Sequence, residues 1–126
     1  MSKGLLVDSD VLIDFLRGEE KAVRFFQAVQ DTITFSVVSV AEIYSGIRGS
    51  EAEVVDQLFA SFPVLPVTAE IARMAGTMRG LFRASHAVEI PDALIAATCE
   101  TNNLELITLN KKHFPMFPEL KPPYTK

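Results

Sequence analysis

The alternation of short apolar runs with segments of helical periodicity is the feature that most constrains the fold. Four runs rich in Val, Ile, Leu, Phe and Thr predict strands over residues 3–7, 32–36, 62–67 and 104–108. Apolar residues recur at helical spacing over 10–17, 20–30, 39–47, 50–60, 68–85 and 91–100. Strands joined through helices form parallel sheets that helices cover on both faces. We therefore expect an α/β fold, a three-layer α/β/α sandwich around a central, mostly parallel sheet.

Length, charge and cysteine content limit the class of protein. The 126 residues suit one domain over 1–126 with a substantial core. The formal net charge of -4 excludes an overall basic field, so a nucleic acid would have to be held by a local site. Cys99 is the only cysteine, which excludes an intrachain disulfide and a cysteine-built zinc site. The amino terminus is unlike a signal peptide and no apolar stretch approaches membrane-spanning length, so we expect a cytoplasmic protein.

Acidic and amide side chains fall at the ends of the expected strands. Asp8 directly follows the first strand, Glu42 lies in the first turn of the helix after the second, and Asn110 follows the last. Ligands of parallel sheets bind outside the carboxyl ends of the strands, so these three side chains should converge at one edge. Asp92 begins the helix before the last strand and joins them only if that helix starts near the same edge.

Each acid also has a local structural explanation. Asp10 is best explained as a helix cap, whereas Asp8 comes too early to cap the same helix well and is favoured as a site residue. Ser39 and Glu42 match the S-x-x-E capping box, which on local grounds favours a capping role for Glu42. Asp92 would complement the dipole of its helix.

The chemistry of these groups in combination suits a hard cation. Oxygen ligands select Mg²⁺ or Mn²⁺, and His86 and His113 are isolated residues best explained as surface or loop positions. An ion held by carboxylates keeps several waters, activates one of them and neutralises charge that develops on phosphate. The combination therefore predicts phosphodiester chemistry.

Four stretches of the chain together resemble the PIN domain, and specifically the small toxin ribonucleases of the VapC type found in toxin–antitoxin pairs. They are LLVDSDVLIDFL at the start, SVVSVAEIYSGI in the middle, IPDALIAATC beyond it and LELITLNKKHF near the end. The resemblance covers essentially the whole chain, and the order and spacing of the four stretches make it specific. It implies a PIN-like fold and an Mg²⁺-dependent endoribonuclease, with Mn²⁺ as an alternative metal, that cleaves RNA phosphodiester bonds.

The resemblance also implies roles for particular residues. Asp8, Glu42 and Asp92 would be the catalytic and metal-binding acids, which overrules the capping interpretation of Glu42. Ser9 and Thr108 match the small hydroxyl residues that line such sites and help to hold waters or phosphate oxygens.

The chain departs from the family pattern after its last strand. Many PIN domains carry a fourth acid at the position of Asn110, and some relatives carry it three residues later, where this chain has His113. Asn keeps an oxygen acceptor but loses a charge, so a second metal should bind weakly or only with substrate. Toxin members with Asn at this position are familiar, so Asn110 does not by itself indicate inactivity.

The resemblance implies protein partners as well as RNA. We expect a homodimer formed through helix faces, and a heterotetramer or larger complex with a cognate antitoxin. The antitoxin would cover an apolar groove and reach an Arg towards the acids. Tyr44, Ile47, Leu58 and Phe59 are candidates for that groove, and each is equally well explained as a core residue.

Three other interpretations start from the same residues. Asp8-Ser9-Asp10 resembles the D-x-D of haloacid-dehalogenase-type phosphatases, but no Lys-bearing strand end or cap is evident and Glu42 would be unexplained. A receiver-type phospho-switch needs a phosphate-accepting Asp at the end of a central strand, and the 62–67 run has none. A catalytically weak or inactive PIN-like module that only binds partners is suggested by Asn110 alone.

Overall fold

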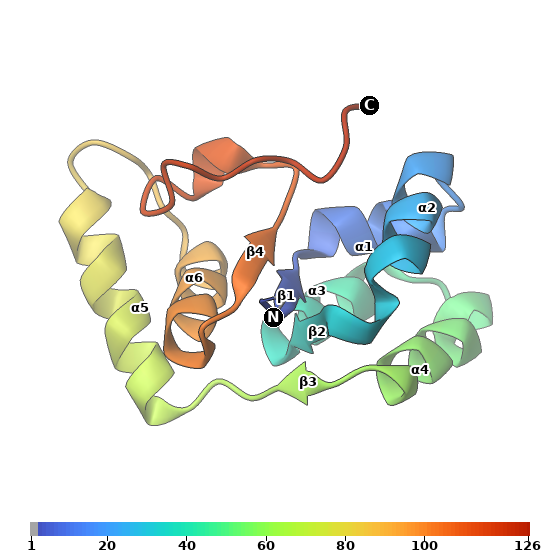
Figure 1. Cartoon of the computed structure of the whole chain (residues 1–126). Helices are drawn as coiled ribbons and strands as arrows, with labels where there is room; N and C mark the ends of the chain where they lie inside the picture. The colour runs from blue at the N-terminus through green and yellow to red at the C-terminus, as the bar shows by residue number, and fades with distance from the viewer. Residues whose placement is uncertain (1–2) are drawn as a thin grey trace.

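The structure, a computed structural model, describes residues 3–126 and alternates strands with helices as the sequence predicts (Figure 1). The strands are β1 (Leu5–Val7), β2 (Ile33–Ser36), β3 (Val64–Leu65) and β4 (Glu105–Ile107). The helices are α1 (Ser9–Leu16), α2 (Glu20–Val29), α3 (Val37–Gly46), α4 (Ala52–Ser61), α5 (Ala69–Phe82) and α6 (Ile90–Asn102). Short 3₁₀ helices occupy η1 (Gln30–Thr32), η2 (Gly49–Glu51) and η3 (Lys111–His113).

The four strands form one parallel sheet in the order β3-β2-β1-β4. Leu5 of β1 lies opposite Ile33 of β2 on one side and Glu105 of β4 on the other. β3 is a two-residue edge strand between Pro63 and Pro66, which agrees with the rule that proline is confined to sheet edges. The predicted parallel sheet and the edge position of its third strand are confirmed.

Both faces of the sheet are buried, because successive side chains of a strand point to opposite faces. Leu5 and Val7 pack with Phe35 of β2 against helices α1, α2 and α4. Leu6 points the other way and packs against Ile95 of α6. Figure 1 shows α5 and α6 on the left of the sheet and α1, α2 and α4 on its right. These are the three layers that the sequence predicts.

Several helix starts differ from the prediction by one or two residues, and two of these differences bear on the site. α1 begins at Ser9, and Asp8 is its N-cap residue, with Oδ1 accepting from the Ser9 N–H at 2.8 Å. The prediction that Asp8 lies too early to cap is wrong. α3 begins at Val37 rather than at Ser39, because Ser36 is already placed as the cap and its hydroxyl accepts from the Val38 N–H at 3.0 Å.

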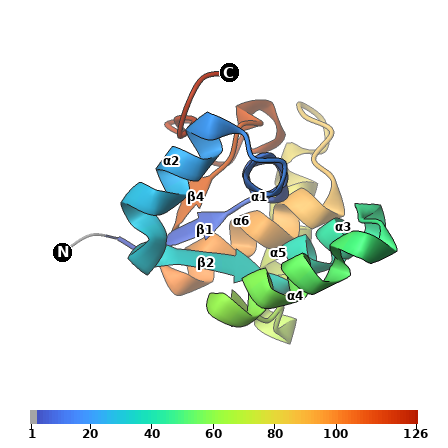
Figure 2. The same cartoon turned by 90° about the vertical axis from the view of Figure 1, so that its right-hand side faces the viewer.

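The carboxyl ends of the two central strands lead directly into helices. Figure 2 shows β1 and β2 running in the same direction and continuing into α1 and α3. The first turns of both helices therefore lie at one edge of the sheet.

Within residues 3–126, no helix has both the length and the apolar character that crossing a membrane would take.

Candidate metal and catalytic site

Two residues at the ends of adjacent strands begin the site. Asp8 follows β1, Thr108 follows β4, and both side chains are buried. Thr108 Oγ1 lies 2.9 Å from Asp8 Oδ2 and 3.2 Å from Asp10 Oδ2. A hydroxyl has a single proton, so Thr108 donates to one of these carboxylates at a time. The other carboxylate is then left without that hydrogen bond.

Asp10 is a member of this cluster that the sequence interpretation missed. Asp8, not Asp10, is the N-cap of α1, but Asp10 does satisfy a free N–H at the helix start, because its Oδ1 accepts from the Val11 N–H at 2.8 Å. Asp10 Oδ2 accepts from the Leu109 N–H at 2.8 Å, which ties the start of α1 to the end of β4. Its spacing of two residues from Asp8, at the end of the same strand, is the signal that could have found it.

Glu42 reaches the same edge from α3. Ser9 Oγ donates to Glu42 Oε1 at 2.7 Å, so Glu42 lies against the residue that follows Asp8. The predicted capping box with Ser39 is wrong, since the helix starts at Val37 and Glu42 lies beyond its first turn.

Asp92 joins the other acids from the first turn of α6, in which Pro91 is the second residue. Its side chain is half-buried, and Asp92 Oδ2 lies 3.4 Å from Nδ1 of His113. Burial raises the pKa of Asp92, and the charges of Glu42 and Asp10 raise that pKa further. The condition set by the sequence, that α6 starts near the same edge, is therefore met.

Asn110 contributes its backbone more than its side chain. Its N–H donates to Thr108 Oγ1 at 3.1 Å, and the residue itself is exposed.

The electrostatics of the cluster favour a cation. Burial raises the pKa of Asp8 to about 7, and the nearby charge of Asp10 contributes to the increase. Burial also raises the pKa of Asp10. Among residues 3–126, none of the ion pairs joins a Lys or Arg to Asp8, Asp10 or Glu42. Asp8 and Asp10 therefore repel each other within the described residues without an ion pair to a Lys or Arg that would offset the repulsion.

The donor set of this site fits a hard divalent ion. Carboxylate and hydroxyl oxygens are the ligands preferred by Mg²⁺ and Mn²⁺. In the part of the chain that the structure describes, no three His, Cys, Asp or Glu side chains are grouped closely enough to hold a metal as they stand. Glu42 is turned to Ser9 and Asp92 to His113, so binding would require these two side chains to turn inward.

A small hollow adjoins Glu42. It has a volume of about 200 Å³ and lies between α1 and α3. Its lining is Ile13, Leu16, Arg17, Glu42, Ile43, Gly46, Ile47 and Glu51. Of the candidate groove residues, Ile47 lines it, whereas Leu58 and Phe59 are half-buried against the core and Tyr44 is exposed.

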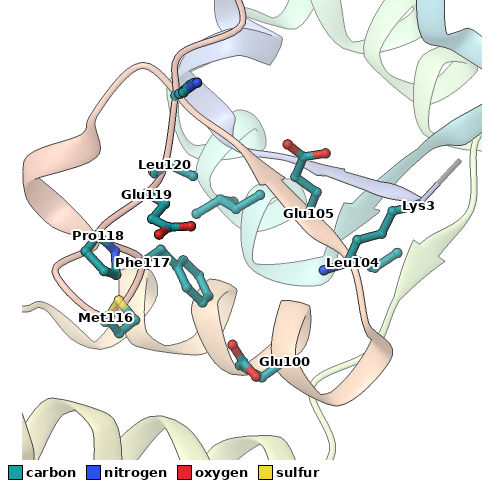
Figure 3. Close-up of a pocket in the computed structure, with 11 residues that line it drawn as sticks. Lys3, Glu100, Leu104, Glu105, Met116, Phe117, Pro118, Glu119 and Leu120 are labelled. Atoms are coloured by element: carbon teal, nitrogen blue, oxygen red, sulfur yellow. The ribbon is translucent and has the colours of Figure 1, made fainter.

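A larger hollow lies away from the acids, at the amino ends of β1 and β4 (Figure 3). Its volume is about 580 Å³, and its walls come from the two strand starts, α6 and residues 116–121. They are formed by Lys3, Glu100, Leu104, Glu105, Leu106, Met116, Phe117, Pro118, Glu119, Leu120 and Lys121. Since Asp8 and Thr108 lie at the carboxyl ends of the same strands, this hollow is not part of the acidic site.

Known proteins share this sequence pattern and this fold. Residues 5–119 match the PIN domain family. The chain is 47% identical over 123 residues to Ribonuclease VapC10 of Mycobacterium tuberculosis, covering 95% of this chain and 92% of the relative. It is 36% identical over 123 residues to Ribonuclease VapC19 of the same organism, covering 94% and 98%.

Solved structures agree with the fold. A toxin–antitoxin complex from Klebsiella pneumoniae matches with a TM-score of 0.82 and 26% identity, over 98% of this chain and 100% of that chain. DNA-bound VapBC from Salmonella typhimurium matches with a TM-score of 0.80 and 19% identity, over 95% and 96%. The fold is that of a PIN domain, and the chain belongs to the PIN-domain family. Within that family it belongs with the VapC-type ribonucleases.

Proposed function

We propose that this protein is the toxin of a type II toxin–antitoxin pair and a metal-dependent endoribonuclease. The observation that carries the proposal is the convergence of Asp8, Glu42 and Asp92 at the carboxyl edge of the sheet. The ribonuclease names of the two mycobacterial relatives support the reaction class. PIN-domain ribonucleases generally use a divalent metal, and we propose Mg²⁺, with Mn²⁺ as the alternative.

Asp8, Glu42 and Asp92 would hold the ion, and Asp10 adds negative charge beside them. A bound divalent cation would supply an activated water and neutralise charge on the scissile phosphate. Thr108 keeps Asp8 oriented through its 2.9 Å hydrogen bond. In the metal-free protein Ser9 holds Glu42 beside the site through a 2.7 Å hydrogen bond. Once Glu42 turns inward to the ion, the Ser9 hydroxyl is placed to bind waters or phosphate oxygens. Because Asn110 carries no charge, a second ion should bind weakly or only with substrate.

The proposed protein partner is an antitoxin that seats on the hollow beside Glu42. The similar chain from Klebsiella pneumoniae belongs to a toxin–antitoxin complex, which supports a partner of this kind. The hollow is lined by apolar side chains such as Ile13 and Leu16 and by the acidic Glu42. An apolar segment that carries an Arg would fill it and reach the acids. A homodimer, and a heterotetramer or larger complex with the antitoxin, remain part of this proposal.

The test is metal-dependent cleavage by the protein freed of its antitoxin. Single-stranded and structured RNAs should be cut in the presence of Mg²⁺ or Mn²⁺, stay intact with EDTA, and be cut again when Mg²⁺ is restored in excess. Cleavage that persists in EDTA would contradict the metal-dependent mechanism. A protein that binds its partners but cuts no RNA with either metal would instead be the inactive PIN-like module.

A further inference from the structure

The hydroxyl of Ser39 is buried and has no hydrogen-bond partner. Within residues 3–126 its Oγ is the one buried side-chain nitrogen or oxygen atom in this condition, and the residue is 0% exposed. Other buried hydroxyls are paired: Thr98 Oγ1 donates to the Leu94 carbonyl at 2.7 Å, and Ser36 accepts from the Val38 N–H. A buried polar group without a partner is costly, so an unpaired one in a native fold calls for an explanation.

Helical geometry places Ser39 on the side of α3 that carries Glu42. With about 100° of rotation per residue, Glu42 lies about 60° from Ser39 on one side and Ile43 about 40° on the other. Ile43 belongs to the core formed with Val7, which lies on the α1 side of the sheet. Ser39 is one turn closer than Glu42 to the sheet edge from which α3 starts.

That side of α3 faces the acidic cluster. α3 packs against both α1 and α6, the two helices whose first turns bring Ser9 and Asp92 to this edge. Glu42, one turn beyond Ser39, is in contact with the Ser9 hydroxyl. The unpaired hydroxyl therefore lies on the buried side of α3, one turn closer than Glu42 to the sheet edge where the acids gather.

We propose that Ser39 is a further positioning residue of this site, and that its hydroxyl binds a water of the hydrated divalent cation when Glu42 leaves Ser9 and turns inward to hold the ion. The proposal rests on the proposed function. Small divalent ions keep several waters when only a few carboxylates hold them, and a metal-bound water needs an acceptor for its protons. A serine oxygen is such an acceptor, and its own proton is free for a carboxylate or a second water.

The test compares Ser39→Ala with the parent and with Ser61→Ala. Ser61 is the control, an exposed helical serine whose hydroxyl already donates to the Gln57 carbonyl at 2.8 Å. Two quantities are measured: the melting temperature of the metal-free protein, and the dissociation constant for Mn²⁺ by calorimetry. Neither depends on RNA cleavage.

For Ser39→Ala we expect a metal-free melting temperature at or above that of the parent, because an unpaired buried hydroxyl has been removed. We expect its Mn²⁺ dissociation constant to rise about tenfold, the lower end of what outer-shell partners contribute to metal affinity. Ser61→Ala should bind Mn²⁺ like the parent. A Ser39→Ala protein that binds Mn²⁺ within about twofold of the parent, or that melts clearly lower without metal, would overturn the role of Ser39. A parent that binds no Mn²⁺ would overturn the proposed metal site itself.

Discussion

At the scale of single residues, Asp8 both caps α1 and stands among other carboxylates. Its pKa is about 7 in the folded protein, against an ordinary value of 3.8. The folded state therefore binds more protons than the unfolded state between these values, and stability falls as pH rises through this window. A divalent cation should reverse the loss at neutral pH, because it stabilises the ionised form.

We predict that the metal-free protein melts at a higher temperature near pH 5 than near pH 8, and that Asp8→Asn flattens this dependence. Each pKa unit corresponds to about 1.4 kcal/mol, and each kcal/mol to roughly 4 °C for a protein of this size. The measurement is a series of thermal melts in EDTA across this range. The raised pKa values of Asp10 and Asp92 act in the same direction, so some slope should remain in the variant. A parent whose melting temperature rises from pH 5 to pH 8 would contradict the assignment.

Glu42 tests whether the acid of α3 belongs to the site. Glu42→Gln keeps an oxygen that can accept from the Ser9 hydroxyl but removes the charge. We predict that the metal-free variant melts higher than the parent at neutral pH, gains less from Mg²⁺, and loses RNA cleavage. Thermal melts with and without Mg²⁺ and an RNA cleavage assay measure these effects. Parent-like cleavage together with an unchanged gain from Mg²⁺ would remove Glu42 from the site.

At the scale of elements, the sequence predicts which segments are helices better than where they start. Ser36 and Ser39 are both acceptable caps, and the S-x-x-E pattern favoured the second. The structure uses Ser36 because α3 begins directly where β2 leaves the sheet. Strand pairing, which local sequence does not encode, decided between the two serines. Because α3 begins at Val37, Glu42 lies beyond the first turn and cannot complete a capping box.

The two serines should therefore respond oppositely to alanine. Ser36→Ala removes the acceptor for the Val38 N–H and should lower the free energy of unfolding by about 1 kcal/mol. Ser39→Ala should cause no such loss in the metal-free protein. Urea unfolding of the two variants beside the parent makes the comparison. Equal losses for both variants would mean that the start of α3 is not set by Ser36.

At the scale of the whole molecule, the end of the described chain returns to the first helix. Tyr124 Oη donates to Asp14 Oδ2 and Lys126 Nζ lies against Asp14 Oδ1, both at 2.8 Å. Burial opposes ionisation of Asp14, but the hydrogen bonds from Lys126 and Tyr124 outweigh it and lower the pKa of Asp14. The Lys21 ammonium also donates to the Thr125 carbonyl. These contacts hold α1, whose amino end carries the site, to the end of the chain.

Removing the positive charge of Lys126 should weaken the attachment of the chain end to α1. Lys126→Met keeps much of the side-chain bulk but leaves the buried Asp14 without its ion pair, and should cost about 1–2 kcal/mol of unfolding free energy. Lys121→Met, an exposed lysine at the large hollow, is the control and should be neutral. Urea unfolding at neutral pH compares the two. Equal stability of the two variants would show that the contact with Asp14 contributes nothing measurable.

The overall architecture followed from the sequence because the alternation of strands and helices allows few sheet topologies. The sequence also predicted that Asp8, Glu42 and Asn110 meet at one edge, since each falls near the end of a strand. The contact between Asp14 and Lys126 spans 112 residues and carries no local signal, so the sequence could not predict it. The hydrogen bond between Asp10 and the Leu109 N–H also joins residues far apart in the chain, so the sequence could not predict it either.

The central claim is that the carboxylates at this edge cut RNA, and Asp8 tests it most directly. RNA cleavage rates in Mg²⁺ should be measured for the parent, Asp8→Asn and Asp31→Asn, each shown to be folded by its thermal melt. Asp31 is an exposed aspartate in η1 that takes no part in the site. The account predicts a parent-like rate for Asp31→Asn and a loss of at least about 100-fold for Asp8→Asn, more than an outer-shell change would cause. Cleavage by folded Asp8→Asn at the rate of the parent would contradict it.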